Sequence, residues 1–215
     1  MPTQEPISQP GLIETLLWTR EEGYYLREGH MARLTHSAWA LGYLSDATRI
    51  DAALEELPKS ADRLRVRLVL QHDGKIDITA QPLASLAPGT VWRAALAMTR
   101  LNSADPLLAH KTTRRAFYDD ERARLAAVYR ADEAIFLNER GEICEGGIAT
   151  IFVPRGGRLI TPPLSRGLLP GVLRHYLIEN GEAVEGDVRL DDLTNGFQLG
   201  NSVRGLIPAR LVEQA

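Results

Sequence analysis

The feature that most constrains the fold of this chain is the stretch from residue 138 to residue 174, where short apolar runs alternate with glycine and proline. Residues 134–137, just before it, and residues 148–153 have the length and composition of buried strands. Between them stands Glu145, followed directly by Gly146 and Gly147. Two glycines let the backbone approach a ligand closely while the preceding carboxylate points at it. Taken alone, such a motif is more often the polar rim of a hairpin.

A helix is expected next, because apolar residues recur with helical spacing at positions 169, 172, 173, 176 and 177. Pro170 suits a first helical turn, and Asn180-Gly181 supplies a left-handed stop. At the start of such a helix, the N–H groups of Val172 and Leu173 have no intrahelical partner and lie at the positive end of the helix dipole. The pattern therefore predicts either an ordinary helix start or a cradle for a phosphate or carboxylate group.

Composition narrows the class of protein. Of the 215 residues, 44% are apolar and 25% are charged, as in an ordinary globular protein of one domain or two modest ones. The formal net charge of -3 gives no preference for nucleic acid or for a membrane surface. No apolar run approaches the roughly 20 residues that span a bilayer, and Cys144 is the single cysteine, so we expect a cytoplasmic protein without disulfides. No metal-ligand spacing is visible, so no metal site is expected.

The first half of the chain has the pattern of a small α+β lobe, expected over residues 1–101. Residues 1–10, with prolines among polar residues, are expected to be a frayed leader. Alternation and turn residues predict strands at 11–19, 24–26, 64–70, 75–80 and 91–98. Helical spacing predicts helices at 29–41 and 50–57. In the strand at 64–70, Arg65 and Arg67 fall on one face.

The second half is expected to form a larger lobe over residues 107–215, joined to the first by a polar linker at 102–106. Its expected elements are helices at 116–128 and 170–180, strands at 134–137, 148–153 and 184–190, and a short helix opening at 191–193. Lys111 stands just before the first of these helices. Such a lysine is usually a plain surface charge, as is Arg33 in the first lobe, and Asn201-Ser202 alone predicts only a turn.

The order of three motifs, EGGIATIF, LITPPL and GLLPGVLR, resembles the class IV aminotransferase family, which includes branched-chain aminotransferases and 4-amino-4-deoxychorismate lyases. HMARL resembles the H-x-x-R-L segment of the family, HKTTRR its lysine segment, and GNS with the following apolar run its last motif. The resemblance runs from Gly11 to the end of the chain. It implies an α+β, two-lobed pyridoxal-phosphate enzyme of fold type IV that acts on a small amino substrate and forms a homodimer.

The resemblance also implies the residues of a site. Lys111 would hold pyridoxal 5′-phosphate and move the substrate proton, and Glu145 would pair with the pyridine nitrogen. The implied ligands of the cofactor phosphate are Arg33, the N–H groups of Val172 and Leu173, and Asn201 with Ser202. A cofactor lysine must lose its proton near neutral pH, which the cationic neighbours Arg114 and Arg115 would favour.

Two further expectations concern the reaction and the extent of the first lobe. HKTTRR, NERGEICEGGIATIFV and GNSVRGLIPARLV are most similar to the lyases of folate synthesis, so the expected products are 4-aminobenzoate and pyruvate. A transaminase acting on branched-chain amino acids, D-amino acids or amines is the first alternative, and a non-catalytic relative of the fold is the second. Family members usually carry two more strands and a D-R-G-containing turn before the segment matching residues 11–15, so a truncated N-terminal lobe is expected.

Overall fold

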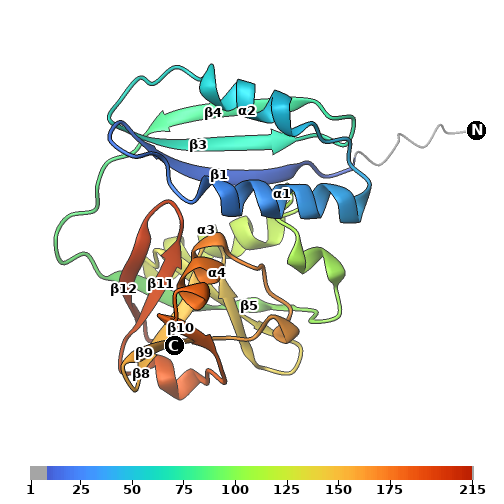
Figure 1. Ribbon diagram of the computed structural model, residues 1–215. Helices are drawn as coiled ribbons and strands as arrows, with labels where there is room; N and C mark the ends of the chain where they lie inside the picture. Colours follow the sequence, from blue (N-terminus) through green and yellow to red (C-terminus); the bar gives the residue numbers. More distant parts are fainter. Residues whose placement is uncertain (1–8, 215) are drawn as a thin grey trace, which may run out of the picture.

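The N-terminal part of the molecule is a four-stranded sheet with two helices on one face (Figure 1). The computed structural model describes residues 9–214, so the expected leader lies almost wholly outside the described residues. The elements are β1 (Leu12–Thr19), β2 (Gly23–Tyr24), α1 (Arg27–Leu41), α2 (Ala47–Glu55), β3 (Arg63–Leu70) and β4 (Ile76–Pro82). The strand order is β2-β1-β3-β4, and each neighbouring pair is antiparallel.

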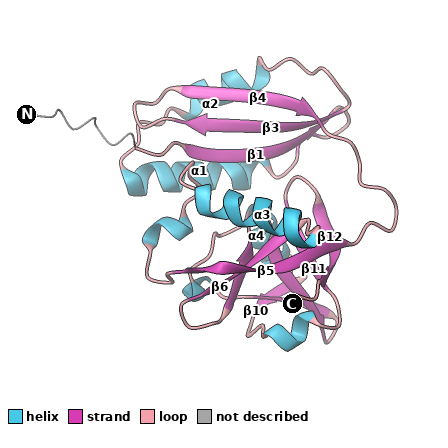
Figure 2. Ribbon diagram, turned by 180° about the vertical axis from the view of Figure 1, so that it is seen from behind, coloured by secondary structure: helices cyan, strands magenta, loops and turns pink. Residues whose placement is uncertain are grey.

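Alternation in β3 decides which face of this sheet the helices cover. Its even-numbered residues are buried in a core shared with α1 and α2: Leu64, Val66, Leu68 and Leu70. Figure 2, seen from behind, shows both helices on that one side of the strands. Arg65 and Arg67 therefore point to the opposite face, which is turned toward the rest of the molecule.

The C-terminal part is built around an eight-stranded mixed sheet in the order β10-β9-β8-β11-β12-β5-β6-β7. Its strands are β5 (Trp92–Leu101), β6 (Glu133–Asn138), β7 (Ile143–Gly146), β8 (Thr150–Arg155), β9 (Arg158–Thr161), β10 (Ala183–Glu185), β11 (Phe197–Asn201) and β12 (Gly205–Leu211). The pairs β10/β9, β12/β5 and β5/β6 are parallel, and the other pairs are antiparallel.

Helices cover this second sheet in two places. α3 (Ala116–Tyr129) packs on one face of β5 and β6, and a hydrophobic core fills the other face, so every residue of β6 is buried. α4 (Val172–Glu179) packs against β10 and β11. Short 3-10 helices span Pro106–Ala109, Leu164–Arg166 and Leu190–Leu193. In the described part of the chain, no helix combines the length and the apolar character that a membrane crossing requires.

The change of sheet comes earlier in the chain than the sequence predicts. β5 belongs to the first lobe in the predicted division, yet it pairs with β12 and β6 inside the eight-stranded sheet. The chain therefore passes between the sheets after Pro82 and before Trp92, and not at the polar segment 102–106. Ala94 and Ala95 are fully buried on opposite faces of β5, which suits a central parallel strand.

α4 begins later than the sequence predicts. Pro170 was a candidate for the first helical turn, but the helix starts at Val172, with Gly171 extended as its N-cap. The Pro170 carbonyl instead accepts a hydrogen bond at 3.2 Å from Arg33, which is 137 residues away in the sequence. Pro170 therefore precedes the helix and connects it to α1.

The strand predicted at 184–190 is only three residues long. β10 ends at Glu185 because its parallel partner β9 ends at Thr161, where Pro162 and Pro163 follow and cannot continue a ladder. Most other predicted elements lie within three residues of their expected bounds. The short strands β7, β9, β11 and β12 were not among the predicted ones.

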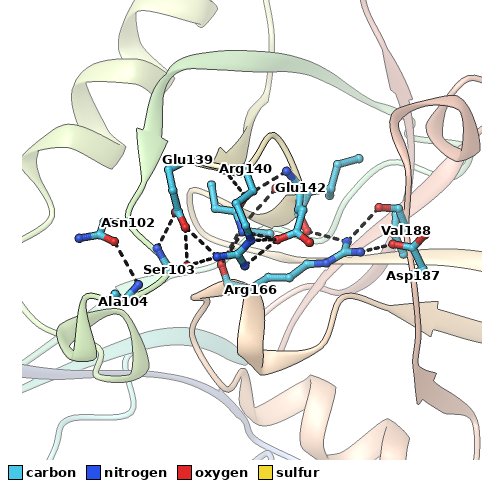
Figure 3. Close-up of polar contacts among 12 residues, drawn as sticks. Asn102, Ser103, Ala104, Glu139, Arg140, Glu142, Arg166, Asp187 and Val188 are labelled. Carbon is cyan, nitrogen blue, oxygen red and sulfur yellow. Dashed lines mark hydrogen bonds and ion pairs between the residues drawn. The ribbon is translucent and has the colours of Figure 1, made fainter.

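A polar network fastens the 102–104 segment to the turn between β6 and β7 (Figure 3). The Glu139 carboxylate accepts hydrogen bonds from the backbone N–H and the hydroxyl of Ser103, at 2.8 and 2.6 Å. These contacts lower the pKa of Glu139 to about 2. On the other side of the turn, the buried Arg166 donates to the carbonyls of Ile143 and Val188, at 3.1 and 2.9 Å. The network therefore supports the start of β7.

Candidate active site

A cavity of about 670 Å³ lies between the two sheets, large enough for a cofactor-sized ligand. All seven residues that the sequence singles out line it: Arg33, Lys111, Glu145, Val172, Leu173, Asn201 and Ser202. They come from α1, the segment before α3, β7, α4 and the end of β11. The fold thus brings motifs from both halves of the chain to one place.

Lys111 lies on a short bridge between the two parts of the molecule. Its carbonyl accepts a hydrogen bond from the N–H of Ile13 at 2.7 Å, and the N–H of Thr113 donates to the Gly11 carbonyl at 2.8 Å. The Thr113 hydroxyl in turn accepts from the Gly11 N–H at 2.9 Å. The lysine backbone is therefore held against the beginning of β1.

The charge on Lys111 is set by groups from several elements. Burial of the amine, followed by the positive charges of Arg33 and Arg115, lowers the pKa of Lys111 to about 8. Glu14 and Glu145 act in the opposite direction. Part of the lysine is therefore an uncharged amine near neutral pH, and such an amine can serve as a nucleophile or a base.

Glu145 is 7% exposed and has a hydrogen-bond donor on each oxygen. Oε1 accepts from the Tyr118 hydroxyl at 2.5 Å, and Oε2 accepts from the Leu169 N–H at 3.0 Å. Burial raises the pKa of Glu145 to about 7, although these two donors and Lys111 favour the charged form. A carboxylate with this proton affinity, lining a cavity, is suited to share a proton with a basic ring nitrogen.

Arg33 and the start of α4 form what we call the phosphate end of the cavity, made up of Arg33, Val172 and Leu173. Arg33 Nη1 donates to the carbonyl of Pro170, so the guanidinium is fixed beside the first turn of α4. Gly171 provides no side-chain cap, and the N–H groups of the first turn have no partner within the helix. A Cβ at Gly171 would lie 2.8 Å from the Thr150 hydroxyl. This donor set is suited to a phosphate group.

Asn201 and Ser202 take different places in the site. The Asn201 side-chain amide donates to the Ile148 carbonyl at 3.1 Å, and its oxygen accepts from the N–H groups of Val203 and Arg204 at 3.0 and 2.9 Å. Asn201 therefore ties its own turn to the glycine turn that follows Glu145. Ser202 is 7% exposed and lines the cavity. The expected phosphate contacts of both residues stay a prediction.

The glycine turn after Glu145 is braced from behind. The buried Glu133 carboxylate accepts hydrogen bonds from the N–H groups of Gly147 and Ile148, each at 3.1 Å. Arg115 donates to the Gly147 carbonyl at 2.9 Å. A Cβ on Gly147 would come within 2.4 Å of the Arg122 side chain. Glycine at this position lets the turn pack closely against the Arg122 side chain, whereas the sequence predicted a close approach to a ligand.

Sequence reasoning missed Tyr118, which donates to Glu145. It lies in the first turn of α3, and its ring packs edge-on against Phe136 with the centroids 4.8 Å apart. Burial and the Glu145 charge raise the pKa of Tyr118, so its hydroxyl stays a donor. The sequence shows only that Tyr118 lies near the start of the helix that follows Lys111. That position does not indicate that its hydroxyl bonds Glu145.

A second group of cavity residues forms what we call the arginine wall: Arg65, Arg67, Arg114 and Arg204. Within residues 9–214, none of the four forms an ion pair with a carboxylate, although Arg65 donates to Gln81 and Arg204 to the Ala84 carbonyl. Burial and the like charges of Arg115 and Arg65 lower the pKa of Arg67. The alternation in β3 predicted that Arg65 and Arg67 share one face of the strand. It did not predict that this face lines the same cavity as Lys111.

Comparisons with known proteins agree with this arrangement. The family model described as "Amino-transferase class IV" matches residues 11–212. A Schizosaccharomyces pombe protein named "Putative aminodeoxychorismate lyase" is 31% identical over 97% of this chain and 92% of its own length. The structure of a "Putative amino-acid aminotransferase" from Mesorhizobium loti is 44% identical, with a TM-score of 0.90 over 95% of this chain and 100% of that chain.

The fold likeness extends to more distant relatives. A "hypothetical aminotransferase from Mycobacterium tuberculosis, alpha-ketoglutarate and PMP bound form" has a TM-score of 0.81 at 24% identity, over 98% of this chain and 86% of that chain. The architecture is thus the α+β fold of the fold-type-IV pyridoxal-phosphate enzymes. With the family model matching nearly the whole chain, the protein belongs to the class IV aminotransferase family, whose enzymes use pyridoxal phosphate and act on small amino substrates.

Proposed function

We propose that this chain is a pyridoxal-phosphate-dependent 4-amino-4-deoxychorismate lyase that releases 4-aminobenzoate and pyruvate. The residues fit the cofactor by their chemistry. Lys111 offers an amine with a lowered pKa, Glu145 offers a buried carboxylate, and the phosphate end offers a guanidinium and free N–H groups. When bound, pyridoxal phosphate accepts the electron pair that the substrate carbon leaves behind on losing its proton.

Each residue of the site then has a role of its own. Lys111 attaches the cofactor and, once displaced by the substrate amine, takes the proton from the ring carbon that bears the amine. Glu145 keeps a proton on the pyridine nitrogen, and Tyr118 and the Leu169 N–H hold that carboxylate in place. Arg33 and the first turn of α4 hold the phosphate, with Asn201 and Ser202 beside them.

The arginine wall is the observation that carries the choice of substrate. Aminodeoxychorismate has two carboxylates, one on the ring and one on the enolpyruvyl group. Arg67 and Arg114 have no acidic partner among residues 9–214, and planar guanidinium groups suit carboxylates. Arg67 is half-buried and Arg114 is exposed, and a branched aliphatic side chain would offer neither guanidinium a carboxylate partner. Loss of the enolpyruvyl group as pyruvate makes the ring aromatic, so no second keto acid is needed.

The named relatives support two functions. The S. pombe protein of similar length carries a lyase name, in line with the HKTTRR and GNSVRGLIPARLV segments. The M. loti protein, at 44% identity, carries an aminotransferase name. A transaminase is therefore the second candidate, and the arginine wall would then hold the distal carboxylate of a dicarboxylic amino acid or keto acid.

The experiment that separates the two is a product assay on the purified enzyme loaded with pyridoxal phosphate. Aminodeoxychorismate is supplied with no keto acid, and 4-aminobenzoate and pyruvate are both quantified. The lyase should release equal amounts of the two, and Lys111→Ala should release both far more slowly. No release from aminodeoxychorismate, together with 2-oxoglutarate-dependent transfer from an amino acid, would assign the chain to the transaminases.

A further inference from the structure

Glu14 is a buried carboxylate that none of the site motifs includes. It is 1% exposed, in the middle of β1. Its two oxygens receive three hydrogen bonds from α1: from Arg33 Nε at 2.8 Å, from Arg33 Nη2 at 2.6 Å, and from His30 Nδ1 at 2.6 Å. A charge buried this deeply is costly unless it is fully paired, as it is here.

The pairing leaves Arg33 with a fixed orientation. Glu14 takes Nε and one donor of Nη2, and the Pro170 carbonyl takes one donor of Nη1 at 3.2 Å. One N–H on each terminal nitrogen remains, and Arg33 lines the cavity. Because only the N-cap Gly171 separates Pro170 from the first turn of α4, these contacts hold Arg33 in register with the N–H groups of that turn.

His30 completes the arrangement from the same helix. It is 1% exposed and lies one turn before Arg33 on α1. An ionised carboxylate only accepts hydrogen bonds, so Nδ1 of His30 must be the protonated nitrogen. This bond goes to Oε2 of Glu14, the oxygen that also accepts from Arg33 Nη2, so His30 and Arg33 restrain the carboxylate together. His30 and Arg33 thus grip one carboxylate from two positions on a single helix.

We propose that Glu14, restrained by His30, is a positioning residue that aligns Arg33 for the cofactor phosphate and balances the charge of Arg33 on Lys111. The inference rests on the proposed cofactor but not on the proposed substrate. Arg33 without a counter-charge would act on Lys111 with its full positive charge, and a loosely held Arg33 would lose part of its ordered contact to phosphate.

The charge-balancing role follows from the groups that face Lys111. These are Arg33 on α1, Arg115 before α3, Glu14 on β1 and Glu145 on β7. Arg33 and Arg115 lower the pKa of Lys111, and the two carboxylates raise it. Removing the Glu14 charge alone should therefore move the pKa of Lys111 below its value of about 8.

Two substitutions separate position from charge. Glu14→Asp keeps the charge and withdraws the carboxylate from Arg33, so the cofactor-free chain should bind inorganic phosphate and pyridoxal phosphate about tenfold more weakly. Glu14→Gln keeps the shape and removes the charge, so Lys111 should titrate at lower pH. The titration is measured on the cofactor-free chain, from the rate at which acetic anhydride labels the Lys111 peptide at each pH. Neither measurement uses a substrate, so a failed lyase assay leaves both interpretable.

Two further variants guard against a general folding effect. His30→Leu keeps the Glu14 charge, so it should weaken phosphate binding a few-fold and leave the Lys111 titration unchanged. Glu121→Gln removes another buried carboxylate, paired with Arg124 away from the cavity, and should alter neither measurement. Wild-type phosphate affinity in Glu14→Asp, an unmoved Lys111 titration in Glu14→Gln, or an equal response in Glu121→Gln would each overturn the proposal.

Discussion

The arginines of the phosphate end and of the arginine wall differ in whether the protein itself supplies their negative partner. At the phosphate end, Arg33 is paired with Glu14 through two hydrogen bonds of 2.8 and 2.6 Å. At the arginine wall, Arg67 and Arg114 have no carboxylate partner among residues 9–214. A cation paired within the protein is oriented before any ligand arrives, which suits a ligand that is always the same. Unpaired cations gain their counter-charge from the ligand, which suits recognition of an anionic substrate.

Lys111→Ala should have the largest effect, because Lys111 is the proposed base and cofactor ligand in the cavity. Loss of the base should lower turnover by roughly 10²- to 10⁴-fold while both groups of arginines stay intact. The chain has only three lysines, Lys59, Lys75 and Lys111, so borohydride reduction and peptide mapping locate the cofactor directly. Lys75→Ala is the matched control. A reduced cofactor on Lys59 or Lys75 would show that Lys111 is not the residue that holds the cofactor.

Glu145→Gln tests the energetic cost of burying the Glu145 charge in the cavity. Folding raises the pKa of Glu145 from 4.5 to about 7, so the folded chain binds the proton more tightly and loses stability as pH rises through that window. The full shift corresponds to roughly 3 kcal/mol. The Gln variant of the cofactor-free chain should lack this loss, as measured by urea unfolding at pH 5 and pH 8. If the free energy of unfolding of the two proteins changed equally between pH 5 and pH 8, the raised pKa of Glu145 would be contradicted.

Arg67→Gln should affect the arginine wall alone. It removes a charge-assisted contact worth roughly 1.5–3 kcal/mol, so kcat/KM for aminodeoxychorismate should fall about tenfold to a hundredfold, mostly through KM. Cofactor affinity should stay as in the wild type. The exposed Arg210 supplies the control, and Arg210→Gln should leave both quantities unchanged. If Arg67→Gln weakens cofactor binding instead, the arginine wall does not serve the substrate alone and its separation from the phosphate end is wrong.

Tyr118→Phe should give the smallest effect, a displaced pH profile. The Tyr118 hydroxyl stabilises the charged form of Glu145, so its loss should raise the pKa of Glu145 above about 7, by roughly one unit. The acid limb of the rate profile should move to higher pH, with activity recovering in alkaline buffer. Tyr129→Phe, at the far end of α3, is the control. An unshifted acid limb would remove Tyr118 from the support of Glu145.

Local patterns were sufficient for the longer elements. Alternation in β3 identified both its buried face and its arginine face, and helical spacing located α1 and α4 to within two residues of their starts. The short strands β7, β9, β11 and β12 carry glycine or proline or span only four residues, and β11 and β12 also pair with the distant strands β8 and β5. No local period announces such strands, because their pairing is decided by their neighbours in the sheet.

By itself, the sequence determined the chemistry that was available and the order of the motifs that carry it. Lys111, Glu145 and Arg33 could be named because their segments resemble the motifs of the class IV aminotransferase family. Only the tertiary structure decided what stands opposite each of them: Glu14 behind Arg33, and Tyr118 behind Glu145. Periodicity specifies the face on which a side chain lies, but a partner across the cavity depends on how two separately formed sheets pack together.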